Sequence, residues 1–267
     1  MTETLPARRP TGAVLAPSGT LEIEGLNPRD LGLRHPLLRI RHPAGGYKLG
    51  QMEAAQLEVV FLKAHRYREY REGENWNDPV LCASSDGYLP LATIAQPRAK
   101  RCESCPYGIW SDDPNTGNRV APPCDEGLAL LGVWPGGQNL PFWFLLNSWS
   151  RIKPTREFLQ TILYYNAAAV GRGEEPIKGF YEFWVTLTTE DRRNGGIHWA
   201  VPQYASRRMP AEEAAPYRDF YAVARDLVYV PEVRGAEAAD DIAEEARAAT
   251  EAEVVTEPAG GNSSVPF

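Results

Sequence analysis

The chain has 267 residues, of which 43% are hydrophobic and 10% aromatic, and this composition indicates a globular protein with one substantial core. The longest apolar runs, such as residues 128–134, are only as long as a strand and end at prolines, so we expect no membrane-spanning segment and no membrane partner. The first four residues, Met-Thr-Glu-Thr, do not begin a signal-peptide core, and a cytoplasmic location is therefore expected.

The net charge of −7 is concentrated at one end of the sequence. Residues 232–267 hold nine of the 35 acidic residues and two of the 28 basic ones, so residues 1–231 hold 26 of each. Because this acidic segment has few apolar residues to bury, we predict that 232–267 is a disordered tail. A neutral body can still carry a basic face, so the overall charge does not exclude a nucleic-acid partner.

Hydrophobic patterning predicts a mainly β (α+β) core between two flexible ends. Residues 1–18, rich in Pro, Ala and Arg, are expected to form a flexible arm, and residues 19–231 the core. Strands are predicted at 21–23, 56–70, 128–134, 142–146, 178–189 and 197–201. In the second of these, alternation places six side chains on one face: Leu57, Val59, Phe61, Lys63, His65 and Tyr67.

Two helices are predicted among these strands. The first begins at Pro154 and ends at Gly171 and Gly173. The second lies within 211–224, and Pro216 is expected to restrict it to the residues that follow. At least five strands with one or two helices favour an OB-like small barrel that carries an insertion.

All four cysteines of the chain lie in one stretch with the spacing C-x19-C-x2-C-x18-C. Zn²⁺ prefers four sulfur or nitrogen donors in a tetrahedron, often supplied as pairs from separate turns. We predict a zinc-ribbon-like insertion at 76–126 in which a structural Zn²⁺ is held by Cys82, Cys102, Cys105 and Cys124. Because four sulfurs would leave no open position for water, the ion is expected to be structural and not catalytic.

Other interpretations of the cysteines remain open. The four could be unrelated buried thiols or an oxidised pair of disulfides, although no secretory signal favours disulfides. An iron–sulfur cluster, which is also built on four thiolates, is a minor alternative to zinc.

Basic and aromatic residues are interleaved in three segments, as expected of a protein that binds single-stranded nucleic acid with a cationic groove and stacking rings. Most aromatic rings in a domain of this size pack in the core, so each ring could equally be structural. On an alternating strand Arg66 and Arg68 would also share one face while Tyr67 points to the other. The predicted nucleic-acid contacts are His65, Arg66, Tyr67, Arg68, Tyr70, Trp76, Arg98, Lys100, Arg101, Tyr107, Trp110, Trp149, Arg151 and Lys153.

A β-rich body, a cysteine insertion and an acidic tail together resemble the single-stranded-DNA-binding proteins of phages and mobile elements. The sequence closes on Ser264-Val265-Pro266-Phe267, and bacterial single-strand-binding proteins similarly end in an acidic segment that closes on Pro-Phe. The resemblance implies that Pro266 and Phe267 bind replication and recombination proteins in a bacterial or phage-infected cell. Two features differ: residues 260–265 are uncharged, and a fourth cysteine stands where the zinc-containing phage proteins use histidine.

The expected function is therefore to coat and protect single-stranded DNA during replication or recombination. The main alternative is a zinc-stabilised adaptor that binds proteins and not nucleic acid. An enzyme is less expected, because the chain has no phosphate-binding loop G-x-x-x-x-G-K-[ST], no H-E-x-x-H and no G-x-S-x-G motif.

Overall fold

The computed structural model describes residues 35–71, 73, 78–92 and 97–231, and the following account is confined to them. The predicted strand at 21–23, the flexible arm at 1–18 and the tail at 232–267 lie outside these residues. The described part is mainly β, with a curled sheet and two α-helices. None of the described helices is both long enough and apolar enough to cross a membrane.

Nine strands form the main sheet. Eight of them follow the order β11-β10-β4-β8-β9-β1-β2-β3, and the ninth, β5, pairs with β4 further along that strand than β10 does. A separate hairpin pairs β6 with β7. All the pairs are antiparallel except β1 with β9. The strands are β1 (Leu37–Ile40), β2 (Tyr47–Leu49), β3 (Met52–Ala54), β4 (Leu57–Arg71), β5 (Val80–Ser84), β6 (Ser111–Asp112), β7 (Arg119–Val120), β8 (Cys124–Trp134), β9 (Leu140–Leu146), β10 (Phe183–Asn194) and β11 (Ile197–Arg208).

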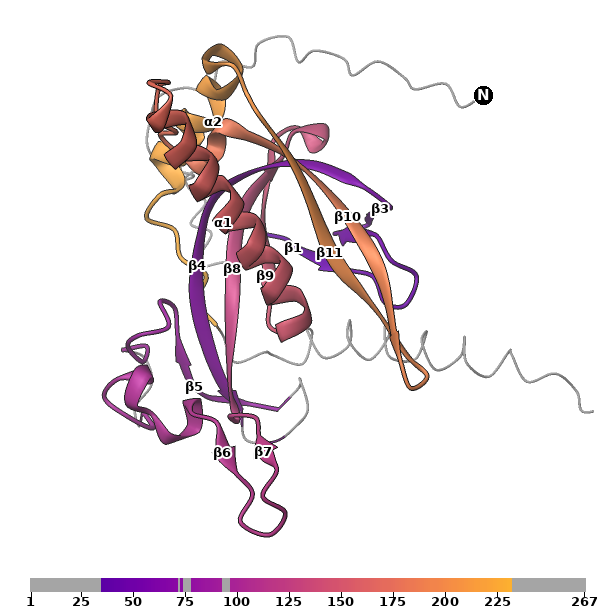
Figure 1. Cartoon of the computed structure of the whole chain (residues 1–267), viewed down its shortest axis with the longest axis vertical. Helices are drawn as coiled ribbons and strands as arrows, with labels where there is room; N and C mark the ends of the chain where they lie inside the picture. Colours follow the sequence, from indigo (N-terminus) through magenta and orange to yellow (C-terminus); the bar gives the residue numbers. More distant parts are fainter. Residues whose placement is uncertain (1–34, 72, 74–77, 93–96, 232–267) are drawn as a thin grey trace, which may run out of the picture.

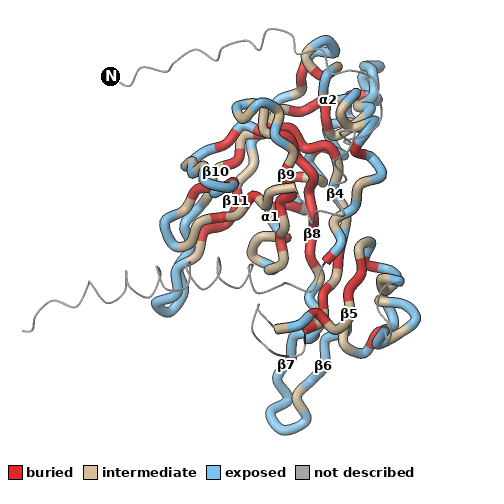
Figure 2. The backbone as a smooth tube through the Cα atoms, turned by 180° about the vertical axis from the view of Figure 1, so that it is seen from behind, coloured by how far each residue is buried: buried red, intermediate tan, exposed pale blue. Residues whose placement is uncertain are grey.

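The paired strands β4 and β8 run along the length of the molecule and connect its two ends (Figure 1). Near its start β4 pairs with β10, and near its end the same edge pairs with β5. The described residues of 80–124, which we name the cysteine module, lie at the far end and include β5, β6 and β7 (Figure 1). Buried residues follow the body of β8 and β9, whereas the β6–β7 hairpin is exposed (Figure 2).

Helix α1 (Trp149–Gly171) covers one face of the sheet, and helix α2 (Ala211–Ala224) lies on the other. From α1, Ile152, Phe158 and Ile162 join a cluster with Leu57, Phe61 and other sheet residues. From α2, Ala214 and Ala224 join a second cluster with Val60, Leu62 and Trp143. The sheet thus separates two hydrophobic cores.

Residues 225–231, which we name the C-terminal strap, follow α2 and lie against β4. The Lys63 ammonium donates to the carbonyl oxygens of Arg225 and Leu227, each at 2.6 Å. The amide of Tyr229 donates to Nε2 of His65 at 3.1 Å. These contacts cover a stretch of β4 on the face that also packs against α2.

The structure corrects three details of the predicted elements. Helix α1 begins at Trp149, five residues before Pro154, and α2 is continuous from Ala211 through Pro216. The pairing of β4 with β8 shifts register between Phe61 and Lys63, so the predicted single face of β4 is wrong. Before the shift Leu57, Val59 and Phe61 belong to the α1 cluster, whereas Tyr67, beyond it, belongs to the α2 cluster.

Candidate metal module and nucleic-acid interface

Two of the four cysteines are positioned by the sheet itself. Tyr70 on β4 is opposite Cys82 on one side and opposite Cys124 on the other. Directly opposed residues point to the same face, so the two thiols flank the Tyr70 side chain. Their backbones are two strand spacings apart, about 10 Å, which leaves room between them for further ligands from outside the sheet.

The other two cysteines come from consecutive tight turns that lie next to this face. The amide of Cys102 donates to the carbonyl oxygen of Tyr88 at 2.8 Å, which ties the turn to the segment after β5. The amide of Cys105 donates to Cys102 at 3.2 Å, and that of Gly108 donates to Cys105 at 2.9 Å. These turns bring all four cysteines to the lining of one small cavity of about 20 Å³. A cavity of this volume accommodates one water-sized occupant.

The cavity is lined by sulfur donors of the kind that bind a soft metal ion. All four cysteines are free thiols. Within the described residues, no group of three or more His, Cys, Asp or Glu side chains is placed to hold a metal ion. Four soft donors around one water-sized cavity nevertheless fit Zn²⁺ better than a hard cation such as Mg²⁺. The zinc site therefore stays a prediction, with the four thiols as its ligands.

Burial controls the protonation of these thiols. It raises the pKa of Cys124 to about 12, and it also raises the pKa of Cys102, while the Arg68 guanidinium opposes both shifts. Without metal the two thiols are thus neutral near pH 7. Binding of an ion would displace their protons, and the positive charge of Arg68 would then lie beside thiolates.

Two of the predicted nucleic-acid contacts are enclosed by the C-terminal strap. The Tyr67 side chain is 3% exposed, and its ring packs edge-on against Tyr229 at 5.1 Å between centroids. His65 accepts the hydrogen bond from Tyr229 and packs edge-on against Trp143 at 5.4 Å. Burial is the main cause that lowers the pKa of His65 to about 4. Neither side chain is available to a base or a phosphate in this structure.

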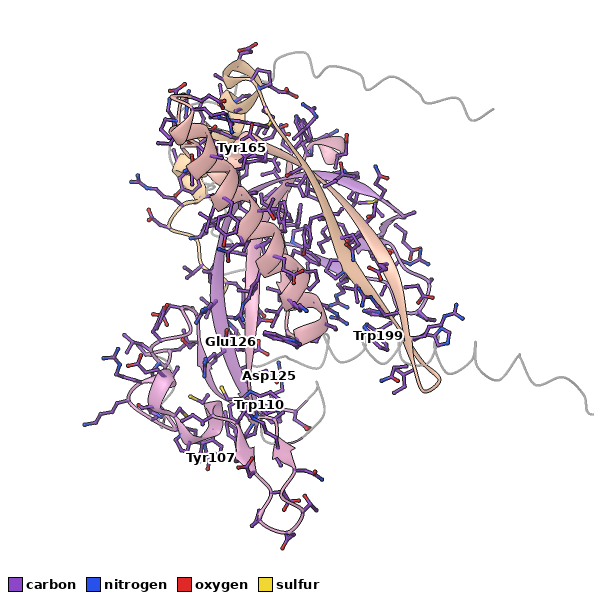
Figure 3. The ribbon with its side chains drawn as sticks, viewed as in Figure 1. Tyr107, Trp110, Asp125, Glu126, Tyr165 and Trp199 are labelled. Carbon is purple, nitrogen blue, oxygen red and sulfur yellow. The ribbon has the colours of Figure 1, made fainter. Side chains whose placement is uncertain are left out.

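Arg66 and Arg68 lie on the opposite face of β4, as the alternation predicts, and there they meet Glu126 of β8. The distances to the carboxylate are 3.9 Å from Nε of Arg66 and 3.0 Å from Nη2 of Arg68. Arg156 of α1 reaches the same carboxylate at 2.5 Å. Glu126 lies between the cysteine module and α1, on the part of β4 and β8 that the helix does not cover (Figure 3).

At this end of the molecule, three aromatic rings each have an arginine guanidinium group packed against them. Arg98 lies over Tyr107, whose ring is 4.8 Å from that of Tyr70. Arg119 lies over Trp110, and Arg156 lies over Trp149, at 5.1 and 5.6 Å from the ring centroids. Trp110 is 53% exposed and Trp149 is 66% exposed. Figure 3 shows Tyr107 and Trp110 in the cysteine module, below Glu126.

The remaining predicted contacts divide between exposed and inward-facing groups. Lys100, Arg101 and Lys153 are exposed, and the last two pair with Glu103 and Glu157 respectively. Arg151 instead turns to the imidazole of His42, with Nη2 2.7 Å from Nε2. Trp76, Pro266 and Phe267 lie outside the described residues.

Three residues of the candidate interface were not among the contacts predicted from the sequence: Arg119, Glu126 and Arg156. Arg156 follows Trp149 by seven residues, which is two helical turns, so an earlier predicted start of α1 would have placed both on one face. Glu126 is opposite Arg68 across the β4–β8 ladder, and that long-range register could not be derived from either segment alone.

Comparison of the chain with family models, with curated proteins and with solved structures finds no match.

Proposed function

We propose that this protein binds single-stranded DNA on one face of the molecule. There the start of α1, the part of β4 and β8 around Arg68 and Glu126, and the cysteine module meet. The observation that carries the proposal is the set of half-exposed aromatic rings with arginines against them at this end of the molecule, namely Tyr107, Trp110 and Trp149. Aromatic rings stack on bases without regard to sequence, and guanidinium groups neutralise the backbone, so together they suit a strand whose bases are unpaired.

The other parts of the chain have supporting roles in this proposal. A structural Zn²⁺ on the four cysteines would fix the module that carries Tyr107 and Trp110, and an OB-like curled sheet would present it. Residues 232–267 would recruit replication and recombination proteins through Pro266 and Phe267, in the cytoplasm of a bacterial or phage-infected cell. The strap from which this segment continues contacts β4 at His65, on the face opposite Arg66 and Arg68, which leaves the proposed interface open.

The proposal is tested by fluorescence anisotropy of labelled single-stranded and double-stranded oligonucleotides, titrated with metal-analysed protein at low and moderate salt. We expect tighter binding of the single strand, and weakening as salt increases. Trp149→Ala should weaken single-strand binding by about 5- to 150-fold, the range for loss of one stacking ring.

Tyr164→Ala is the matched control for that variant. Tyr164 is on the same helix and, like Trp149, is 66% exposed, but it lies 15 residues further along, about 22 Å away. Equal loss from both variants, or no binding of either oligonucleotide by folded, metal-loaded protein, would remove the support for this interface.

A protein-binding adaptor is the second candidate, because α1 also exposes apolar side chains near its end. Leu163 and Tyr164 are 65% and 66% exposed, and Val170 is 52% exposed. Exposed apolar groups of this kind are typical of protein contacts. An adaptor would bind its protein partner equally well with and without added oligonucleotide, whereas a single-strand binder would not retain full oligonucleotide affinity after loss of Trp149.

A further inference from the structure

Three arginines converge on one carboxylate at the centre of the proposed interface. Arg66, Arg68 and Arg156 all lie within 4 Å of Glu126, at 3.9, 3.0 and 2.5 Å. These four side chains together carry a charge of +2. A guanidinium group has five N–H donors, so one carboxylate uses only a minority of the donors that surround it.

The cluster differs from an ordinary structural ion pair in the same pair of strands. On the other face of β4, Arg71 pairs with Glu69 at 2.5 Å, Asp125 also interacts with both charges, and the side chains of Arg71 and Glu69 are at most 8% exposed, so the cation there is not in excess. Around Glu126, in contrast, the cations outnumber the anion and two of them are open to solvent. The side chains of Arg66 and Arg156 are 49% and 39% exposed.

Arg68 and Glu126 hold the other two arginines in place. Arg68 is directly opposite Glu126 in the β4–β8 ladder and its side chain is only 15% exposed. Its Nη1 also reaches the carbonyl oxygen of Cys102 at 3.5 Å, which links the cluster to the cysteine module. Arg156 is held from the other side, because its guanidinium lies over the Trp149 ring. An orientation fixed before binding reduces the entropy cost of binding an anion.

We infer that this cluster is the phosphate subsite of the interface, with Arg66 and Arg156 contacting oxygens of the phosphodiester backbone. The inference rests on the proposed function and specifies which part of the strand each group contacts. Planar guanidinium groups bind phosphate oxygens through two parallel hydrogen bonds, and a phosphate next to Glu126 would offset the excess positive charge. The Trp149 ring beside Arg156 would place a stacked base next to that phosphate.

The test separates phosphate contacts from base contacts. Binding of oligo(dT) and of an abasic strand of equal length is measured over a range of salt concentrations for the wild type, Arg66→Gln and Arg156→Gln. Each arginine variant should reduce the slope of log K against log salt by about 0.7, the contribution of one phosphate contact on a single strand, and should do so for both strands. Trp149→Ala should instead weaken oligo(dT) binding more than abasic binding.

Two controls identify the source of any effect. Arg172→Gln removes an exposed arginine at the other end of α1, paired with Glu174 at 2.5 Å, and should leave both slopes unchanged. Arg156→Lys, which keeps the charge, should restore most of the slope. Replacing sodium chloride by sodium phosphate at equal ionic strength tests whether phosphate competes for the cluster: it should weaken oligo(dT) binding by the wild type more than by Arg156→Gln, and equal weakening of the two would contradict a phosphate subsite.

The outcomes distinguish this inference from the proposed function. If the wild type binds oligo(dT) but Arg66→Gln and Arg156→Gln keep the wild-type slope on both strands, the phosphate subsite is wrong while single-strand binding stands. If the wild type binds neither strand, the proposed function fails and the subsite fails with it. A thermal unfolding curve for each variant establishes that the fold is intact; if either glutamine variant unfolds, the methionine variant of the same arginine (Arg66→Met or Arg156→Met), which keeps an apolar stem but no charge, is measured in its place.

Discussion

The two ends of β4 and β8 are built on different physical principles. In the body, these strands bury side chains on both faces, so that Phe61 joins the cluster under α1 while its neighbour Leu62 joins the cluster under α2. Next to the cysteine module the same strands carry Tyr70, Glu126 and the thiol of Cys124, and the neighbours of these groups are ion pairs and the turns of the module. Among the described residues, no residue between positions 67 and 128 of the sequence belongs to the buried set of either hydrophobic cluster, so the cysteine module contributes to neither core.

The two parts are stabilised by different interactions. Burial on both faces stabilises the body without any added group. The module has short turns and a two-stranded hairpin, and so small a unit needs a crosslink, a metal ion or a partner for independent stability. The four cysteines line its cavity and are the groups able to supply that crosslink.

If the four cysteines hold Zn²⁺, as we propose, its removal should have the largest effect and should affect one end alone. Structural Zn²⁺ contributes about 10–16 kcal/mol to the folding of isolated zinc-finger peptides at neutral pH, so its loss should unfold the module. We expect chelation, or Cys102→Ser, to remove amide-exchange protection between residues 80 and 124 while β9 and β10 keep theirs. The measurement is hydrogen exchange read by mass spectrometry, with metal content determined on the same samples.

Two results would contradict the expectation that metal stabilises the module alone. If purified protein contains neither zinc nor iron and its module amides are protected to the same extent with and without chelator, the thiols are ordinary buried groups. If β9 loses protection together with the module, the two ends form one cooperative unit and the distinction between them is wrong.

A core substitution tests the other end of the comparison. Phe61 is fully buried, and its ring packs against those of Phe142 and Phe180 at 6.3 and 5.5 Å between centroids. Phe61→Ala should lower the free energy of unfolding of the body by about 3–5 kcal/mol, through lost burial and the cavity it leaves. Denaturant unfolding followed by a probe in the body measures this loss.

Tyr107→Ala is the matched aromatic substitution in the module. The Tyr107 ring is only half-buried and contacts Tyr70 and Arg98. We expect its loss to leave the unfolding midpoint of the body nearly unchanged. A loss comparable to that of Phe61→Ala would mean that the module stabilises the body through β4, contrary to the separation described above.

The sequence predicted the elements with strong local patterns and missed those set by distant contacts. The alternation at 56–70 and the apolar runs at 128–134 and 142–146 identified β4, β8 and β9, because their own residues encode burial. Strands β1, β2 and β3 have only three or four residues each, and their pairing, not their composition, makes them strands. Helix α2 continues through Pro216 although the ring removes a backbone donor, since Tyr217, Phe220 and Tyr221 pack against the sheet.

The same distinction applies to the candidate site. The cysteine spacing indicated that the four thiols belong together; they line one cavity because β4 pairs with both β5 and β8, and because two consecutive turns position Cys102 and Cys105. The orientation of His65 and Tyr67 depended on one extra residue in β4 and on the strap that reaches them from residues 225–231. Neither feature has a local signal, so the sequence did not indicate that these two side chains lie under the strap.

Acidification should produce the smallest effect, and it should act on the body through the strap. Burial lowers the pKa of His65 from 6.5 to about 4, and Nε2 of its neutral ring accepts the hydrogen bond from Tyr229. Because the folded-state pKa lies below the unfolded one, the unfolded chain takes up the proton first as the pH falls. The stability that His65 contributes is therefore complete above about pH 6.5 and is lost progressively toward pH 4.

Urea unfolding of the wild type at several pH values between about 7.5 and 4.5 measures this loss, which should be accompanied by exchange of the Tyr229 amide. Burial also lowers the pKa of His42 to about 4, so His65→Gln should remove only part of the pH dependence. His198→Gln, at an exposed position in the β10–β11 hairpin, should leave it unchanged. If His65→Gln keeps the full wild-type dependence, the strap is not held by the neutral imidazole, and the pH sensitivity of the body has its origin at His42, at His35, whose pKa burial also lowers, or in carboxylates.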